Sequence, residues 1–283
     1  MADTTPPAWP ALAAAAASIR MKAVEMSHRS RAAHLGSALS CADILAAVYF
    51  GVLRIDPQNP ADPDRDRFIL SKGHAASALF AALALRGFFP EQDLEQYASP
   101  GCTLEEHPTP KSAPGVEAAT GSLGHGLPIG AGMALGARIA GRPTRVFVLM
   151  SDGEQNEGSV WEAAMFAAGQ HLQNLCAIID FNRWQATGRS CEVLCLEPLA
   201  DKWRAFGWSV VEVDGHDPQA LADAMSGMPD PSGKPLCIVA HTVKGKGVTF
   251  MEDDNNWHYR APNDDELARA LAELAVPSTL DEQ

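Results

Sequence analysis

The 283-residue sequence lacks several patterns that define large classes of protein. It has no apolar run near the roughly 18 residues that a membrane span requires, so we expect no membrane insertion. Basic residues are the minority, 22 Lys and Arg against 35 Asp and Glu, and the formal charge of −13 argues against nucleic acid as a partner. Met1 to Pro10 lacks the basic start and apolar core of a secretory signal, which favours a cytoplasmic protein.

Common metal and nucleotide motifs are also missing. The six cysteines include no C-x-x-C pair, and no H-E-x-x-H occurs, so we expect reduced thiols and no zinc site. Gly121 to Gly126 reads G-S-L-G-H-G, which has neither the Lys-Ser/Thr ending of a P-loop nor the order G-x-G-x-x-G. Taken alone, this stretch is either a ligand-binding loop or an ordinary glycine-rich turn.

Strand-like apolar runs alternate with helical patterns along the chain. The runs that predict strands are 67–70, 146–150, 175–179, 208–213 and 236–240. Helical patterns cover 11–31, 75–86, 156–170, 217–225 and 264–274, with one more helix capped by Ser40 and another that starts in the glycine-rich stretch 121–132 and runs to Arg138. This alternation predicts an α/β fold, a doubly wound, mainly parallel sheet with helices on both faces. We expect a disordered lead-in over 1–10 and one domain over 11–283.

One long segment, 88–119, shows no periodic pattern and contains five prolines. Long irregular loops in compact domains are more often functional than idle. We therefore expect this loop to lie over a site.

Asp152 and Asn182 each follow an apolar, strand-like run. In a parallel sheet with a helix between the two strands, both residues would lie at the same carboxyl edge. A carboxylate and an amide oxygen are ligands for a hard divalent cation, and the backbone around Gly153 would lie where a helix N-terminus favours an anion. The pair predicts a split metal and diphosphate site, although each residue taken alone also suits an ordinary turn.

Four histidines lie in loops flanked by Gly or Pro, which is where reacting groups collect. They are His34, His74, His107 and His258. Each one taken alone is also compatible with a structural or solvated histidine, and sequence spacing does not show whether they converge. Lys244, in the turn K-G-K-G, suits either an anion site or a solvated basic turn.

Several motifs occur in an order that resembles the N-terminal, diphosphate-binding part of transketolase. They are A-H-L-G at 33–36, R-F-I-L-S-K-G-H-A at 67–75, G-V-E-A-A-T-G-S-L-G at 115–124, the unit from Asp152 to Asn182, and V-K-G-K-G at 243–247. The resemblance spans about residues 11 to 268. It implies the thiamine-diphosphate-binding fold and a transferase that moves a two-carbon ketol unit from a ketose phosphate to an aldose phosphate.

The resemblance also implies roles for individual residues. Asp152, Asn182 and the backbone carbonyl of Trp184 would hold Mg²⁺. The residues expected beside thiamine diphosphate are Gly121, Ser122, Leu123, Gly124, Gly153, Glu157 and Lys244, with Glu157 also part of a charged network between paired sites. The substrate channel would be lined by His34, His74, His107 and His258.

A full transketolase continues into a pyrimidine-binding domain, whereas this sequence stops at Gln283. The resemblance therefore predicts a split enzyme, active with a separate C-terminal transketolase subunit in a heterotetramer with two copies of each. Two alternatives remain. One is another thiamine-diphosphate enzyme subunit, either 2-oxo-acid decarboxylating or deoxyxylulose-phosphate synthase-like, and the other is a non-catalytic cofactor-binding subunit.

Overall fold

A five-stranded sheet forms the centre of the computed structural model, which describes residues 12–275. Its strands are β1 (Arg67–Leu70), β2 (Val146–Ser151), β3 (Leu175–Phe181), β4 (Ser209–Asp214) and β5 (Leu236–His241). All pairings are parallel, and the strand order is β1-β2-β3-β5-β4. The lead-in predicted over 1–10, residue 11 and the segment 276–283 of the predicted domain lie outside the described residues.

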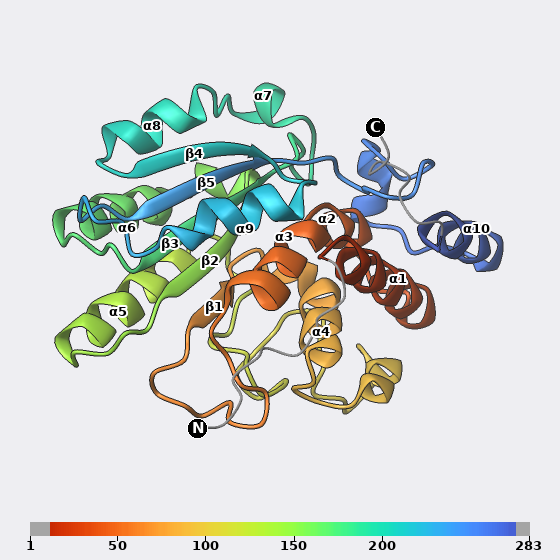
Figure 1. The fold of residues 1–283 in the computed structure, drawn as a ribbon. Coiled ribbons are helices and arrows are strands. Elements are labelled where there is room, and N and C mark those ends of the chain that lie inside the picture. The colour runs from red at the N-terminus through yellow and green to blue at the C-terminus, as the bar shows by residue number, and fades with distance from the viewer. Residues whose placement is uncertain (1–11, 276–283) are drawn as a thin grey trace, which may run out of the picture.

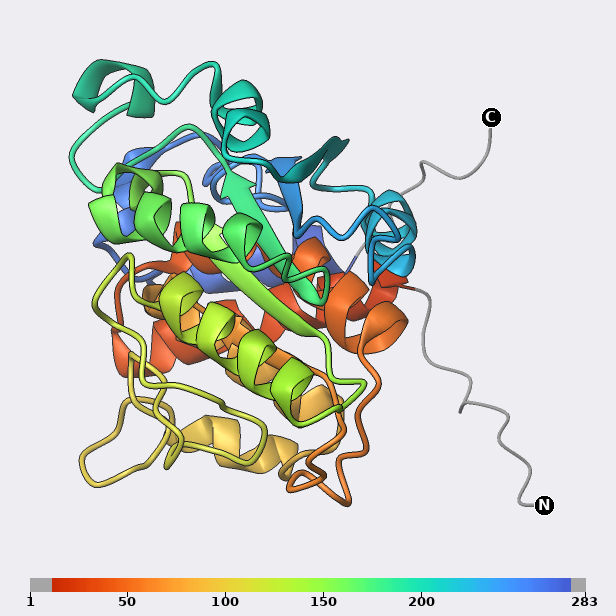
Figure 2. The same cartoon turned by 90° about the vertical axis from the view of Figure 1, so that its left-hand side faces the viewer.

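Helices cover both faces of this sheet (Figures 1 and 2). One layer contains α1 (Leu12–Ser30), α2 (Leu35–Ser40), α3 (Ala42–Ala46), the π-helical η1 (Ala47–Val52), α4 (Ala76–Leu85) and α9 (Pro218–Ser226). The other contains α5 (Gly126–Ile139), α6 (Gly158–Gly169) and α8 (Leu199–Ala205). The predicted fold class is confirmed.

Strand residues alternate between the two apolar layers. In β2, Phe147 and Leu149 pack with the layer of α1 to α4, while Val146, Val148 and Met150 pack with α5 and α6. Successive side chains of a strand point to opposite faces, so a strand buried on both faces is apolar throughout. This explains why the sequence shows a continuous apolar run here rather than a polar-apolar alternation.

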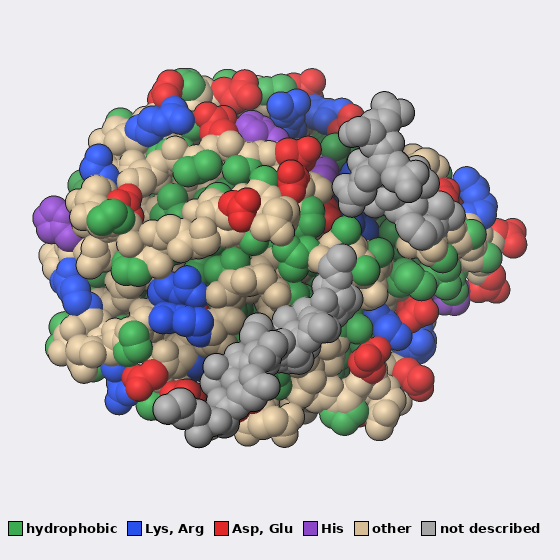
Figure 3. Space-filling model, viewed as in Figure 1, with side chains coloured by type: hydrophobic (Ala, Val, Ile, Leu, Met, Phe, Trp, Pro, Cys, Tyr) green, Lys and Arg blue, Asp and Glu red, His purple; other side chains and the backbone are tan. Residues whose placement is uncertain are grey.

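Short elements and one terminal helix complete the chain. They are η2 (Gly73–Ala75), η3 (Glu91–Gln96), η4 (Gly153–Asn156), α7 (Ser190–Val193), η5 (Asn255–His258) and α10 (Asp264–Leu274). Between residues 12 and 275, no helix is long and apolar enough to cross a membrane. On the face in Figure 3, acidic and basic side chains are interspersed among the described residues.

One predicted helix start is wrong and another is confirmed. Ser40 is the last residue of α2 rather than a cap, and its buried hydroxyl donates to Asp180 Oδ2 at 2.6 Å. The helix expected to begin within 121–132 begins at Gly126, after Gly124, whose φ of +81° lies outside the helical region. The error at Ser40 lies at the carboxyl edge of the sheet, where a tertiary contact overrides local propensity.

Candidate active site

The carboxyl ends of the central strands place the predicted metal residues at one edge of the sheet. Ser151 pairs in register with Asp180, so Asp152 and Asn182 follow at nearly the same level. The Asp152 side chain is fully buried and accepts hydrogen bonds from the Gly153 N–H and the Ser190 hydroxyl, each at 2.8 Å. Burial raises the pKa of Asp152 to about 6. A buried carboxylate that lacks a bonded cation is suited to binding one.

Asn182 is held in one orientation by its neighbours. Its Nδ2 lies 3.4 Å from both Ser40 Oγ and Asp180 Oδ2, and its Oδ1 accepts the Trp184 N–H at 3.0 Å. The amide nitrogen therefore points toward a buried carboxylate and the amide oxygen toward the following loop. This is the orientation in which Asn182 can offer its oxygen to a cation.

A buried ion pair that sequence reasoning did not assign lies beneath Asn182. Lys72 and Asp180 are both fully buried and in direct contact, and the Lys72 amine also donates to the Ser37 carbonyl at 2.9 Å. The Thr242 hydroxyl donates to the other oxygen of Asp180. Burial would raise the pKa of Asp180, but Lys72 outweighs it and holds that pKa below its ordinary value. Both residues stand in motifs that resemble transketolase, and a Lys followed by Gly-His after a strand was the available signal.

Glu154 is a second buried carboxylate that sequence reasoning missed. It accepts hydrogen bonds from the Ser71 hydroxyl, from Gly124 N at 2.8 Å and from Ser151 N at 3.3 Å. Burial raises the pKa of Glu154. Through these bonds Glu154 ties the glycine-rich segment to the ends of β1 and β2.

The glycine-rich segment depends on glycine for close packing. A Cβ at Gly124 would lie 2.6 Å from Glu157 Cβ, and the positive φ adds strain for any other residue. A Cβ at Gly121 would lie 3.4 Å from the ring of His107. Gly121 and Ser122 are exposed and Leu123 is half-buried, while Glu157 is exposed at the start of α6. The segment therefore lies between the strand ends and the long loop that carries His107.

The structure brings the four predicted histidines together. The ring centroid of His34 lies 4.8 Å from that of His258, 5.3 Å from His74 and 6.2 Å from His107. They come from the start of α2, from η2, from the loop over 88–119 and from η5. The His34 N–H also donates to the His258 carbonyl at 2.8 Å. The loop over 88–119 thus contributes His107 to the cluster.

Burial lowers the pKa values of His34, His74 and His258, so these three imidazoles are neutral at neutral pH. Burial, assisted by nearby Lys244, lowers the pKa of His258 to about 3, and burial with His107 lowers that of His34 to about 4. Lys244 is almost fully buried, and its amine lies 3.0 Å from His258 Nδ1 and 2.7 Å from Asn255 Oδ1. Burial lowers the pKa of Lys244 to about 8. Lys244 therefore belongs to the cluster and is not a solvated turn residue.

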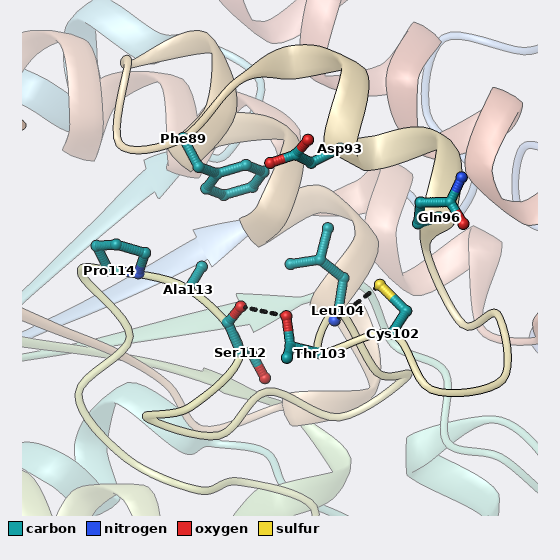
Figure 4. Close-up of a pocket in the computed structure, with 9 residues that line it drawn as sticks. All are labelled: Phe89, Asp93, Gln96, Cys102, Thr103, Leu104, Ser112, Ala113 and Pro114. Atoms are coloured by element: carbon teal, nitrogen blue, oxygen red, sulfur yellow. Dashed lines mark hydrogen bonds between the residues drawn. The ribbon is translucent and has the colours of Figure 1, made fainter.

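A separate cavity of about 280 Å³ lies within the long segment 88–119 (Figure 4). Phe89, Asp93 and Gln96 line it from η3 and the residues before it, and loop residues from Cys102 to Leu104 and from Ser112 to Pro114 line the other side. None of the predicted site residues lines this cavity. It is distinct from the histidine cluster.

Comparison with known proteins identifies the class. The fold and site define a thiamine-diphosphate-binding domain: the family model described as transketolase, thiamine diphosphate binding domain, matches residues 12–278. The chain belongs to this transketolase family. In Clostridium sp. (strain MSTE9), the 6-deoxy-6-sulfo-D-fructose transketolase subunit SqwG is 43% identical over 241 residues, which cover 85% of this chain and 88% of that protein.

Further relatives agree. One of the subunits of the apulose-4-phosphate transketolase of Actinobacillus succinogenes is 42% identical over 92% of this chain and 94% of its own length. Among solved structures, transketolase from Leishmania mexicana superposes with a TM-score of 0.88 at 28% identity, covering 94% of this chain and 41% of that one. The chain therefore spans less than half of such a transketolase. Because relatives of matching length are named transketolase subunits, the prediction of an N-terminal subunit of a split transketolase, a transferase, is confirmed.

The residues at the sheet edge fit thiamine diphosphate with a hard cation. Among the described residues, buried polar atoms without a hydrogen-bond partner include His34 Nδ1, Thr120 Oγ1 and Gln185 Nε2. Such atoms usually meet water or a ligand. Residues 12–275 hold no cluster of three His, Cys, Asp or Glu side chains suited to a metal. A cation here would combine Asp152 with neutral oxygens such as that of Asn182, a set that suits Mg²⁺ and leaves positions for phosphate oxygens.

Proposed function

We propose that this chain binds thiamine diphosphate and Mg²⁺ and, with a separate subunit, transfers a two-carbon ketol unit from a ketose phosphate to an aldose phosphate. The observation that carries the proposal is the convergence of four histidines in a fold whose strand register also brings Asp152 and Asn182 to one sheet edge. The ring centroids of His74, His107 and His258 all lie within 6.2 Å of that of His34, an arrangement that a structural role alone would not require.

Asp152, the Asn182 amide oxygen and the Trp184 carbonyl are the proposed ligands of Mg²⁺. The burial of Asp152 and the fixed orientation of Asn182 support this assignment. Gly153, the exposed and half-buried residues Gly121 to Leu123, and Gly124 are proposed to lie along the cofactor. The backbone at the glycines can approach the cofactor closely, since glycine has no side chain to keep it away.

The histidines are proposed to handle protons and to hold the sugar. Bound thiamine diphosphate would supply the carbon nucleophile. His34, His74, His107 and His258 would donate or accept protons at hydroxyl and carbonyl oxygens of the substrate, which is the usual role of catalytic imidazoles. Lys244 occupies His258 Nδ1, so Nε2 is the ring nitrogen that His258 has free for the substrate.

The partner is proposed to be a C-terminal transketolase subunit that carries the pyrimidine-binding domain. The subunit names of the relatives and the 41% coverage of a solved transketolase support this. We propose a heterotetramer, with exposed Glu157 in the charged network between two sites, in the cytoplasm. Ketose substrates with an anionic end fit the names of the relatives, one of which refers to a sulfonated ketose and two to apulose 4-phosphate.

Reconstitution tests this proposal. The chain, its candidate partner from the adjacent reading frame, and their mixture are assayed for ketol transfer with ketose phosphate donors and a sulfonated ketose, with and without cofactor and Mg²⁺. We expect turnover only when both subunits, cofactor and Mg²⁺ are present. Full activity of the chain alone would refute the split site, and turnover of pyruvate in place of a ketose would indicate a decarboxylating or deoxyxylulose-phosphate synthase-like enzyme. Cofactor binding without any turnover would indicate a binding subunit.

A further inference from the structure

Two loops of the candidate site are joined at the surface by a compact group of three side chains. The loop after β3 contains Asn182 and Trp184 and ends at Ser190, and we call 182–190 the metal loop. The loop after β5 contains Lys244 and His258, and we call 244–258 the histidine loop. The joining side chains are Trp184 and Arg189 from the metal loop and Asp253 from the histidine loop.

Trp184, Arg189 and Asp253 contact one another through three hydrogen bonds and one cation–π contact. Arg189 donates two hydrogen bonds to Asp253, each at 2.6 Å, one to each carboxylate oxygen. The Trp184 indole N–H donates to the same carboxylate at 2.8 Å. The Arg189 guanidinium also lies 3.8 Å from the centre of the Trp184 ring. A planar bidentate pair combined with a cation–π contact is stronger than the single-contact ion pairs that surfaces usually carry.

Backbone conformation indicates that the arrangement is held against strain. Asp253 has φ +57°, a left-handed conformation that costs energy outside glycine, and Arg183 at the start of the metal loop has φ +67°. Asp253 N donates to the Lys244 carbonyl at 2.8 Å, so this strained residue is fixed to the lysine that contacts His258. The side-chain group therefore maintains a backbone geometry that local propensity disfavours.

The same group is connected to both halves of the site. On one side, Trp184 N donates to Asn182 Oδ1, and the hydroxyl of Ser190, next to Arg189, donates to Asp152. On the other side, Asn255 accepts from the Lys244 amine and donates to the Ala186 carbonyl of the metal loop at 3.1 Å. Displacing either loop would therefore disturb the proposed metal ligands and His258 together.

We propose that Arg189, Trp184 and Asp253 form a clamp that sets the metal loop in its ligating conformation and fixes its position relative to His258 before the cofactor binds. Their side chains act as positioning groups, since they bond one another and not the reacting atoms; the proposed metal ligand at Trp184 is its backbone carbonyl. The proposal rests on the proposed function for its consequence in cofactor affinity, but not for its consequence in loop stability. Through the clamp, the position of the proposed metal ligands, which would hold the diphosphate, depends on the position of His258.

The variants are Arg189→Ala, Asp253→Asn and the double substitution. Asn tolerates the left-handed conformation as Asp does, so Asp253→Asn removes the charge without adding backbone strain. The matched control is Arg142→Ala, because Arg142 and Asp64 form an exposed pair at 2.7 Å with similar exposure, remote from the site. Arg189→Lys keeps the charge but loses the bidentate geometry, and it should recover only part of the effect.

Two measurements test the clamp. Amide hydrogen exchange of the cofactor-free chain should become about tenfold faster over 182–190 and 253–258 in both single variants, with the sheet unchanged and the double variant no worse than either single. In the reconstituted enzyme, affinity for thiamine diphosphate at saturating Mg²⁺ should fall about 5- to 20-fold, the range that a bidentate pair and a cation–π contact together would give.

The two measurements, hydrogen exchange and cofactor affinity, distinguish a failure of the clamp from a failure of the proposed function. Exchange in the two loops that matches that of Arg142→Ala would overturn the clamp, whatever the affinities. Faster exchange with an unchanged Kd would overturn its role in presetting the metal loop. If wild-type enzyme binds no thiamine diphosphate with Mg²⁺, the proposed function fails, and the exchange arm still decides whether the clamp holds the two loops.

Discussion

The candidate site has two parts that are built by different means: a proposed metal half, with Asp152 and Asn182, and a histidine half, with the four clustered histidines. Asp152 and Asn182 follow neighbouring parallel strands, and their relative position is set by the register that pairs Ser151 with Asp180. The four histidines come from four separate segments between residues 34 and 258, and no strand pairing relates them. The metal half therefore inherits the rigidity of the sheet, whereas the histidine half depends on how loops pack over it.

Between the two halves lies the buried pair Lys72 and Asp180. Asp180 contacts Asn182 on the metal side, and Lys72 donates to the Ser37 carbonyl in α2, whose N-cap is His34. The pair is thus the place where the sheet and the loops are fixed to each other. Substitutions in the pair and in each half test whether the two halves respond separately to a change or together.

The largest effect is expected from Lys72→Met. The substitution leaves Asp180 charged, fully buried and without its cation, so the free energy of unfolding should fall by about 3–5 kcal/mol. Urea unfolding of the chain measures this. Lys22→Met, which removes a half-exposed lysine near Glu25 and Glu91, should change it by less than about 0.5 kcal/mol.

A second substitution sharpens this result. Adding Asp180→Asn to Lys72→Met removes the orphaned charge and should restore part of the lost stability. A loss below about 1 kcal/mol for Lys72→Met alone would mean that the buried pair does not join the two halves.

Asp152→Asn should affect the metal half alone. Asparagine keeps the size of the side chain and its ability to accept from Gly153 N, but it lacks the charge that a divalent cation requires. We expect affinity for thiamine diphosphate with Mg²⁺ to fall by more than about 100-fold, since even outer partners of metal ligands are worth 10–100-fold. Isothermal titration of the reconstituted enzyme measures the affinity, and an unchanged Kd would remove Asp152 from the metal site.

His107→Ala and His258→Ala should affect the histidine half alone. Positioned acid–base groups contribute about 10²–10⁴-fold to rate, so kcat should fall by about 100-fold in each while the Kd of the cofactor stays within about threefold. His28→Ala is the control, because His28 lies in the last turn of α1 and pairs with the exposed Asp264. Equal losses of kcat and cofactor affinity would show that the two halves are one unit.

The contrast between the halves also explains what the sequence could predict. Apolar runs and strand–helix alternation located all five strands, and topology alone placed Asp152 and Asn182 at one edge. The convergence of His34, His74, His107 and His258 was beyond spacing arguments, because it depends on the path of irregular loops. Their Gly- or Pro-flanked loops singled these histidines out, the resemblance implied a shared role, and the structure supplied their distances.

The residues that sequence reasoning missed are buried charges. Lys72, Asp180 and Glu154 lie inside motifs but have partners that are distant in sequence, such as Asp180 for Lys72 and Gly124 for Glu154. A lone charged residue after a strand is usually solvated, so composition gives no reason to bury it. The same limit explains the wrong cap at Ser40, whose hydroxyl serves Asp180 rather than a helix end.

The smallest effect is expected from acid, and it should act on the histidine half. His34 and His258 have folded pKa values lowered to about 4 and about 3 by burial, with Lys72 and Lys244 opposing protonation, against an ordinary 6.5 in the unfolded chain. The unfolded chain therefore takes up protons first as the pH falls from about 6.5 toward 4, and the folded state loses stability over that window. Buried Asp152 and Glu154, whose pKa values are raised, act in the opposite direction.

Because solvent reaches part of the histidine cluster, we expect the free energy of unfolding to fall by about 1 kcal/mol per histidine between pH 7 and 5. Urea unfolding measures the free energy of unfolding at pH 7 and at pH 5. The difference between the two values should be smaller in the double variant His34→Gln and His258→Gln than in wild type. An equal difference would mean that these histidines are not the acid-sensitive part of the site.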